Sequence, residues 1–416
     1  MNDACPLANC IRETVVDLMF FDAGGGHRAS AAALKSVLED EYPSWHVRMT
    51  NLRDVLEPID FIRRIAGVRI EDVYNSLLLQ RGLTLGTGPM LRATQMLIRR
   101  LHRKEVTLLA GFWENNPSDL VVSLIPNFNR AIFEGLRSAN ASLGKPSTPM
   151  VTILTDLADY PPHFWIERQP QYLVCGTDEA VRQARVMGYS SQNTFLTSGM
   201  VVRPEFYRPQ NGDRQRERAA LGLSPDLPTG LVSFGGYGSR RMITVAKRVA
   251  EAGLPTQLIF LCGHNRKLRE RLLAMDLPYP AYVEGFTTDM PRLMHLADYF
   301  VGKPGPGSIS EALVMDLPVV VERSHWTMVQ ERFNTEWILA RGVGVVLHSF
   351  SEIATGILPM LDPEGLALFR ERIAEVRTRA VFEIPRIMES LLRNPRALDS
   401  DITLSESDVV PGERAA

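Results

Sequence analysis

The stretch FDAGGGHRASAAAL (Phe21–Leu34) decides the fold expected for this chain. The apolar run just before the glycines, VVDLMFF (15–21), is typical of a buried parallel strand, and the residues from Leu34 to Leu38 have helical spacing. The three consecutive glycines therefore form a strand-to-helix turn, where backbone N–H groups can approach a ligand closely. The dinucleotide pattern G-x-G-x-x-G is absent, because His27 directly follows contiguous glycines, and this disfavours a redox cofactor. A turn that only packs the helix on the sheet is the structural alternative.

Length and composition indicate a folded protein of two domains. The chain has 416 residues, of which 45% are apolar and 23% are charged, and this is too long for one ordinary core. The formal net charge of −2 gives no reason to expect a nucleic acid partner. The four cysteines lack zinc spacing, and no apolar run reaches the roughly 18 residues of a membrane span. We expect a soluble or peripheral protein in a reducing compartment, without a structural metal.

Strand-like runs alternate with helical segments along both halves of the chain, which predicts an α/β fold with parallel sheets. A segment rich in proline, arginine and polar residues begins at Gly199 and separates the halves. The last twenty or so residues are polar and acidic, and lack aromatic residues, as in a disordered tail. The expected division is into a first domain (1–200), a second domain (201–361), C-terminal helices (362–395) and a disordered tail (396–416).

Two further glycine-bearing turns lie in the second half. SFGGYGSRR (233–241) follows a strand, and GKPGPGSISEAL (302–313) offers backbone donors suited to a diphosphate. In the latter turn Ser308 can cap a helix and Glu311 can either complete a capping box or bind ribose hydroxyls. Next, HWTMVQERFNTEWI (325–338) places polar side chains at helical spacings of three and four, which suits sugar hydroxyls but is also common on a solvated helix surface.

These motifs together resemble those of monogalactosyldiacylglycerol synthases and processive diacylglycerol glucosyltransferases, which are family 28 glycosyltransferases. The resemblance covers about residues 15–380. The motifs that carry it occur in the family's order and read DAGGGHRASA, TDL with PPHFW, GMVVRPEF, FGGYGS, GKPGPGSISEAL and QERFN. It implies a GT-B fold, in which two Rossmann-like, doubly wound domains face each other across a cleft. It also implies that the second domain (201–361) binds the UDP-sugar donor, that the first domain (1–200) binds a lipid acceptor and the membrane, and that the C-terminal helices (362–395) cross back to the first domain.

The resemblance assigns roles residue by residue. On the acceptor side, Gly25, Gly26 and Pro126 would line the site, and His27 would take the proton of the acceptor hydroxyl in an inverting displacement. Asp156 is the second candidate for the base, or a group that orients the acceptor. On the donor side, the residues that would contact the nucleotide, diphosphate, ribose or sugar are Gly235, Gly236, Tyr237, Phe286, Gly305, Gly307, Ser308, Glu311, Gln330, Glu331 and Asn334. No cofactor or metal is expected, because no D-x-D pair is suitably placed and the G-P-G-S helix start can neutralise the departing UDP.

Two features on the acceptor side need separate comment. Ile125 stands where the galactolipid synthases typically carry a histidine, and the order of residues around His163 is altered, so the sequence leaves the acceptor open. The segment from Arg53 to Glu105 interleaves arginines with apolar residues, a pattern that suits an anionic membrane surface, although core-facing helices with solvated arginines are the alternative. The expected location is the cytoplasm, with the protein peripheral on the inner face of the cell membrane.

The leading hypothesis is a hexosyltransferase that moves galactose or glucose from a UDP-sugar to diacylglycerol or a related lipid. A UDP-sugar 2-epimerase of similar fold would share the donor motifs, but it would have no use for a lipid-facing segment. A glycosyltransferase with another acceptor and a nonenzymatic lipid- or nucleotide-binding protein are the remaining alternatives.

Overall fold

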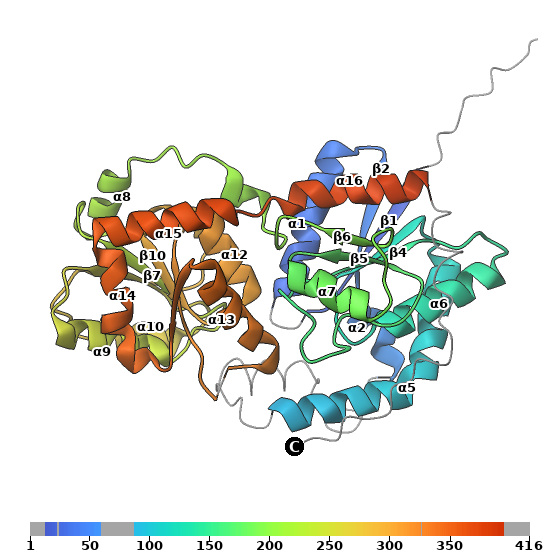
Figure 1. The fold of residues 1–416 in the computed structure, drawn as a ribbon, viewed down its shortest axis with the longest axis horizontal. Helices are drawn as coiled ribbons and strands as arrows, with labels where there is room; N and C mark the ends of the chain where they lie inside the picture. The colour runs from blue at the N-terminus through green and yellow to red at the C-terminus, as the bar shows by residue number, and fades with distance from the viewer. Residues whose placement is uncertain (1–12, 23–24, 60–86, 326, 395–416) are drawn as a thin grey trace, which may run out of the picture.

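The computed structural model contains two lobes, each built on a six-stranded parallel sheet (Figure 1). It describes residues 13–22, 25–59, 87–325 and 327–394. Several features discussed above lie outside the described residues: Cys5, Cys10, residues 60–86 of the arginine-rich segment and the predicted tail (396–416).

The first lobe has strand order β2-β1-β3-β4-β5-β6. Buried apolar residues fill β1, β3, β4 and β5, as expected for strands covered on both faces by helices. The strands are β1 (Thr14–Phe20), β2 (Trp45–Asn51), β3 (Leu120–Ser123), β4 (Met150–Ile153), β5 (Tyr172–Cys175) and β6 (Thr194–Leu196). The helices are α1 (Gly26–Glu41), α2 (Leu52–Leu56), η1 (Glu57–Ile59), α5 (Thr87–Asn115), α6 (Asn129–Ser142) and α7 (Asp178–Val186).

The second lobe has strand order β12-β11-β10-β7-β8-β9, which is the Rossmann order. The topological switch point, where the strand order changes direction, lies between β7 and β10. Its strands are β7 (Thr229–Ser233), β8 (Gln257–Leu261), β9 (Ala281–Glu284), β10 (Tyr299–Gly302), β11 (Val319–Glu322) and β12 (Gly344–Leu347). Its helices are η3 (Pro204–Tyr207), α8 (Arg214–Ala220), α9 (Arg241–Ala252), α10 (Arg266–Leu273), α11 (Met290–His295), α12 (Pro306–Val314), α13 (Val329–Arg341), η4 (Phe350–Glu352), α14 (Ile353–Leu361) and α15 (Pro363–Glu375).

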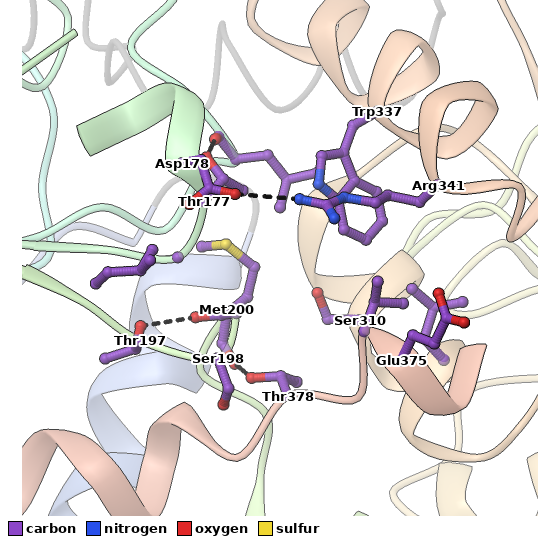
Figure 2. A pocket seen from close by; sticks show the side chains of 16 residues that line it. Thr177, Asp178, Thr197, Ser198, Met200, Ser310, Trp337, Arg341, Glu375 and Thr378 are labelled. Carbon is purple, nitrogen blue, oxygen red and sulfur yellow. Dashed lines mark hydrogen bonds and ion pairs between the residues drawn. The ribbon is translucent and has the colours of Figure 1, made fainter. Parts of the chain in front are cut away.

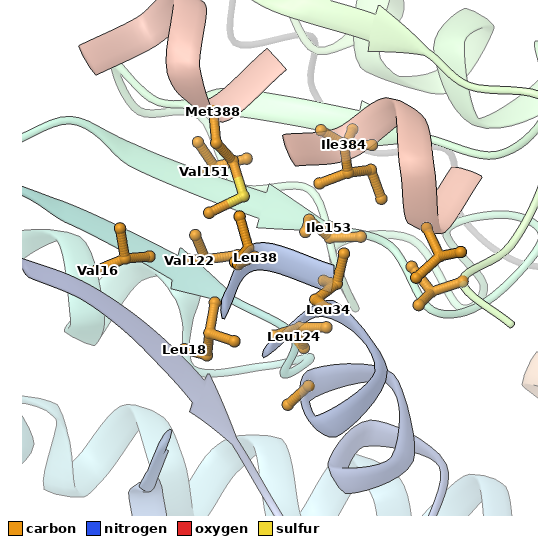
Figure 3. Close-up of a cluster of buried hydrophobic side chains, with 14 of the residues drawn as sticks. Val16, Leu18, Leu34, Leu38, Val122, Leu124, Val151, Ile153, Ile384 and Met388 are labelled. Atoms are coloured by element: carbon orange, nitrogen blue, oxygen red, sulfur yellow. The ribbon is translucent and has the colours of Figure 1, made fainter. Parts of the chain in front are cut away.

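The last described helix, α16 (Ala380–Arg393), returns to the first lobe and packs beside α1 (Figure 1). Figure 3 shows Ile384 and Met388 of α16 together with Leu34 and Leu38 of α1 in one buried cluster over the first sheet. The preceding helix, α15, stays on the second lobe, where Ile373 is fully buried. It begins as the sequence predicts, with Asp362 accepting a hydrogen bond from the Gly365 N–H and proline at the first helical position.

All pairings between neighbouring strands of the described chain are parallel. The carboxyl ends of the strands in each sheet therefore lie at one edge, where ligands bind in doubly wound folds. The glycine turns singled out in the sequence all follow such strand ends.

Candidate active site

The two lobes approach each other through the loops at these carboxyl ends. The rings of Tyr160 in the first lobe and Phe333 in the second have centroids 5.7 Å apart. An ion pair of 3.3 Å joins Asp178 at the start of α7 to Arg341 at the end of α13. Charges of the second lobe also reach Asp156 in the first, because Glu331 and Lys303 both influence the pKa of its carboxyl group. The loops that carry the predicted site therefore face one another.

The first glycine turn is open in front of its backbone. Gly25 is the N-cap of α1 with φ of 80°, a conformation that favours glycine. A Cβ atom added at Gly25 or Gly26 would meet no atom within 4 Å. Side chains at these two positions would therefore not clash with the packing of the helix against the sheet. The space in front of them is open to a ligand.

His27 stands in the first turn of α1 and is held by a neighbouring loop. Its Nδ1 lies 3.0 Å from Oγ1 of Thr155, and its ring is tilted against Trp165 with centroids 5.8 Å apart. Burial lowers the pKa of His27 to about 4, although a hydrogen bond to the backbone of Leu124 opposes the shift. The imidazole is consequently neutral near pH 7, which is the state that a general base requires.

Asp156 follows Thr155 directly and shares Trp165 with His27. The indole Nε1 donates a hydrogen bond of 2.9 Å to Oδ2 of Asp156. Burial raises the pKa of Asp156 to about 7; the bond from Trp165 and the charge of Lys303 lower it, and Glu331 raises it. The structure thus brings both predicted catalytic candidates to one cluster, joined by Thr155 of the TDL motif and Trp165 of the PPHFW motif, two residues to which the sequence analysis gave no role.

The remaining acceptor-side loops are tied to each other in unusual backbone conformations. Asn127, next to the half-buried Pro126, has φ of 68°, and His163 has φ of 63°. The N–H of Asn127 donates to the carbonyl oxygen of Phe164 at 2.6 Å, and Gln95 of α5 donates to Asn127 Oδ1 at 3.1 Å. The loop after β3, the loop after β4 and α5 are therefore held together around the predicted acceptor side.

In the second lobe, the turn after β7 packs against the turn after β8. Gly235 has φ of 78°, and the N–H of His264 donates to the Gly236 carbonyl at 2.8 Å. A Cβ atom at Gly263 would lie 2.1 Å from that carbonyl oxygen, so this contact requires glycine. The space beside Gly235 and Gly236 is open, as it is at the first glycine turn.

Aromatic side chains line the neighbouring strand ends. His264 and Phe286 are stacked with centroids 4.2 Å apart and an interplanar angle of 15°, and Tyr237 lies 6.0 Å from His264. Phe286 remains 56% exposed, so one face of this stack is available to a planar ligand. His264 and Phe286 line a cavity of about 400 Å³. The sequence analysis predicted Tyr237 and Phe286 but missed His264, which directly follows Gly263 just after the end of β8.

The third glycine turn leads into α12. The helix begins at Pro306 with Gly305 as its N-cap, so Ser308 lies inside the first turn and the predicted serine cap is wrong. Gly307 is exposed, and a Cβ atom there would meet nothing within 4 Å. Because no side chain caps the helix, the N–H groups of its first turn are available to an anion.

Glu311 points from α12 toward the segment that joins the lobes. Its carboxylate lies 3.7 Å from the guanidinium of Arg203. Burial raises the pKa of Glu311 to about 7, and Arg203 opposes the shift. The capping box with Ser308 is absent, which leaves the carboxyl group available for other partners.

The polar residues of α13 differ in their surroundings. Glu331 is buried and forms an ion pair of 2.8 Å with Lys303. Asn334 is fully buried and donates to the Pro304 carbonyl at 2.7 Å, so it supports the loop before α12 from beneath. Gln330 is half-buried, with Nε2 3.6 Å from the sulfur of Met328. Of the three predicted residues, Asn334 is placed beneath the loop rather than at its surface.

A second, smaller cavity of about 150 Å³ lies beside the crossing between the lobes (Figure 2). Thr177, Ser198 and Met200 line it from the first lobe and the joining segment, and Trp337 and Arg341 line it from α13. None of the predicted site residues contributes to it.

Two kinds of feature are absent from the part of the chain that the structure describes. No three His, Cys, Asp or Glu side chains gather there as a metal site. None of the described helices combines the length and the apolar character needed to cross a bilayer.

Comparisons with known proteins agree with the motifs and the fold. No family model matches the chain. It is 28% identical over 397 residues to the chloroplastic monogalactosyldiacylglycerol synthase of Spinacia oleracea, covering 90% of this chain and 72% of that protein. A glycosyltransferase from Rickettsia africae superimposes with a TM-score of 0.57 at 11% identity, covering 92% of this chain and 100% of the other. A putative UDP-N-acetylglucosamine 2-epimerase from Listeria monocytogenes gives a TM-score of 0.57 at 14% identity, covering 94% and 100%.

The structural matches confirm the predicted two-domain architecture, and they include both a glycosyltransferase and a putative epimerase. The sequence matches add a more specific relationship, because they cover nine-tenths of the chain and carry the name of one synthase. The chain is thus a GT-B protein related to the monogalactosyldiacylglycerol synthases, as its motifs predicted.

Proposed function

We propose that this protein transfers a hexose, galactose or glucose, from a UDP-sugar to the hydroxyl group of diacylglycerol or a related lipid, with inversion at the anomeric carbon. One observation carries the proposal. The open first turn of α12 and the stacked aromatic pair lie on one lobe, and Asp156 on the other lobe lies within electrostatic reach of Lys303 and Glu331 beside that helix. A nucleotide-linked sugar held by the second lobe would then present its anomeric carbon to the first.

His27 is the general base in this proposal. In the tautomer that carries its proton on Nδ1, which lies 3.0 Å from Thr155 Oγ1, the Nε2 lone pair would accept the proton of the acceptor hydroxyl. The acceptor oxygen then forms its bond to the anomeric carbon while the bond from that carbon to the β-phosphate oxygen breaks, and UDP leaves with the electron pair. Asp156, as a carboxylate above about pH 7, accepts a hydrogen bond from the acceptor or the sugar and keeps it in line.

The donor side provides for each part of UDP. The exposed face of Phe286, backed by His264, suits the uracil ring. The first-turn N–H groups of α12, at Gly307 and Ser308, suit the diphosphate, and Gly235, Gly236 and Tyr237 border it. Glu311 suits the ribose hydroxyls, and Gln330 and Glu331 suit the sugar hydroxyls. The reaction requires no metal in this proposal, because the helix start stabilises the negative charge of the departing UDP.

The helix α5 is the proposed contact with an anionic membrane surface. In its described part Met96 is 60% exposed and Leu97 is 37% exposed, and the exposed Arg100, Arg103 and Lys104 follow them. Apolar side chains next to cations suit the boundary between acyl chains and anionic headgroups. This helix also contacts the acceptor-side loop through Gln95, so the membrane and the acceptor site would be adjacent. The protein would act from the cytoplasm on the inner face of the cell membrane.

Membrane contact is tested by vesicle sedimentation. Replacement of Arg100, Arg103 and Lys104 by glutamate should reduce binding to vesicles that contain phosphatidylglycerol. The same charge change at Lys247, Lys267 and Arg271, exposed residues of the second lobe, is the control. Equal binding by both triple variants would exclude α5 as the contact.

A UDP-sugar 2-epimerase is the second candidate, because a putative epimerase has a similar fold. The curated relatives, which are named as synthases, favour transfer instead. The deciding experiment incubates the protein with isotopically labelled UDP-glucose or UDP-galactose and diacylglycerol vesicles, and in parallel with UDP-N-acetylglucosamine, and analyses the products by mass spectrometry and NMR, because an epimer has the same mass as its substrate. A lipid-linked hexose with one UDP released per sugar is expected. UDP release without glycolipid would exclude diacylglycerol as the acceptor, and a changed sugar still attached to UDP would identify an epimerase.

A further inference from the structure

Lys303 and Glu331 form an ion pair at the start of α12. Nζ and Oε1 are 2.8 Å apart, and the side chains of Lys303 and Glu331 are 33% and 7% exposed. A Cβ atom added at Gly305, the N-cap residue, would lie 3.6 Å from both of these atoms. The pair therefore flanks the N-cap of the helix whose N–H groups are proposed to receive the diphosphate.

The helix start of α12 by itself offers a diphosphate only partial charge. A helix N-terminus is equivalent to roughly half a positive charge. UDP gains one further negative charge when the bond to the anomeric carbon breaks. A full positive charge beside the helix start would stabilise that developing charge more strongly than the dipole does.

The ammonium group of Lys303 also lies near a side chain of the first lobe, Asp156. Lys303 lowers the pKa of Asp156 while Glu331 raises it, so both charges lie near the side chain that faces the donor. Glu331 is itself a predicted sugar-binding residue. In the structure its carboxylate accepts a hydrogen bond from Lys303.

Resting on the proposed function, we infer that Lys303 is a diphosphate-binding residue that exchanges Glu331 for the phosphates when the donor binds. The ammonium group moves its hydrogen bonds to the β-phosphate and keeps its proton throughout the transfer. Glu331 is thereby released to accept hydrogen bonds from sugar hydroxyls. Binding of the nucleotide and recognition of the sugar are then coupled through one ion pair.

The alternative is that the ion pair only holds the loop before α12 in place. Removing the lysine alone would leave a buried carboxylate without its partner, which destabilises a fold whatever the lysine does for the ligand. The test therefore uses Lys303→Gln, Lys303→Arg and the double variant Lys303→Gln with Glu331→Gln, in which both charges are removed together. Melting temperature identifies any variant that fails to fold.

Calorimetric binding of UDP and of uridine, which lacks phosphates, distinguishes the two roles. Lys303→Gln and the double variant should bind UDP roughly 10- to 100-fold more weakly, with uridine affinity changed by less than about threefold, and Lys303→Arg should retain most UDP affinity. UDP affinity equal to wild type in the double variant, or equal losses for UDP and uridine, would overturn the inference. If wild-type protein bound no UDP at all, the proposed donor itself would be wrong. Wild-type binding with unaffected variants would reject only the role of Lys303.

Discussion

Nδ1 of His27 lies 3.0 Å from Oγ1 of Thr155, across the boundary between the loops that follow β1 and β4. Residues far apart in the sequence meet here because β1 and β4 are parallel strands of one sheet, separated by β3. A ring nitrogen fixed by a second group leaves the other nitrogen in a defined direction and tautomer, which is how histidine bases are commonly oriented.

Thr155→Val should therefore slow hexose transfer without removing the base. The substitution keeps the shape of the side chain but deletes the hydroxyl, and we expect kcat to fall about 10-fold, the scale of one hydrogen bond. Steady-state kinetics should show an unchanged KM for the UDP-sugar. Thr155→Ser retains the hydroxyl and should restore most of the rate; a serine variant as slow as the valine variant would argue against orientation by this bond.

His27→Ala should reduce transfer by roughly two to four powers of ten, because general-base catalysis contributes on that scale. UDP affinity, measured by calorimetry, should be nearly unchanged, since the imidazole belongs to the acceptor side. His46→Ala, on an exposed position of β2, is the matched control and should retain full activity. Undiminished turnover in the His27 variant would transfer the role of base to another residue.

The raised pKa of Asp156 leads to a prediction of how the transfer rate depends on pH. Its pKa is raised to about 7, so the carboxylate predominates above that pH and the neutral acid below it. If the carboxylate holds the acceptor, kcat of the wild type should fall as the pH decreases through about 7, whereas His27, with a pKa of about 4, stays neutral over that range. Asp156→Asn should be slower and nearly independent of pH between about 5.5 and 8. The exposed Asp276→Asn should keep the wild-type profile, and a pH limb that survives in the Asp156 variant would disprove this assignment.

Most strands of the two sheets could be anticipated from apolar runs, but not all of them could. The buried runs of β1, β3 and β4 are continuous and therefore easy to recognise. In β2, by contrast, His46 and Arg48 interrupt the pattern, and the strand is held partly by an ion pair of 2.8 Å from Arg48 to the buried Asp17. That pairing is a property of the tertiary structure and has no local signal.

In the candidate site, too, residues with a local sequence signal could be predicted, and residues placed by the tertiary structure could not. Glycine turns are easy to recognise because they combine a rare residue run with a strand end, and His27 directly follows one of them. Phe286 lies outside these turns and was predicted from the family resemblance. Thr155, Trp165 and His264 could not be found in this way, since their importance comes from neighbours brought by other strands. The serine cap of α12 failed because Gly305 and Pro306 begin the helix before Ser308.

Phe286→Ala should weaken UDP and uridine equally, by roughly 10-fold, because stacking of one base on an aromatic side chain contributes about 1–3 kcal/mol. This equal loss differs from the selective loss of UDP expected at Lys303, so the pair of variants maps base and phosphate separately. Phe286→Tyr keeps the ring stacked on His264 and should bind both ligands normally. Calorimetry that shows no change for the alanine variant would place the base away from this ring.

Glu105→Gln should stabilise the protein at high pH. Glu105 is 2% exposed in α5, and its Oε2 has no hydrogen-bond partner. Burial raises its pKa from 4.5 to about 7, so the folded state binds a proton more tightly than the unfolded state does. Its contribution to stability is fully present below about pH 4.5 and is lost as the pH rises through about 7, at a cost of up to about 3 kcal/mol. The glutamine variant should therefore melt several degrees above wild type at pH 8 and close to it at pH 5, whereas Glu114→Gln, on an exposed position of the same helix, should change neither value. A gain for Glu105→Gln that is equal at both pH values would show that removal of the buried charge is not its cause.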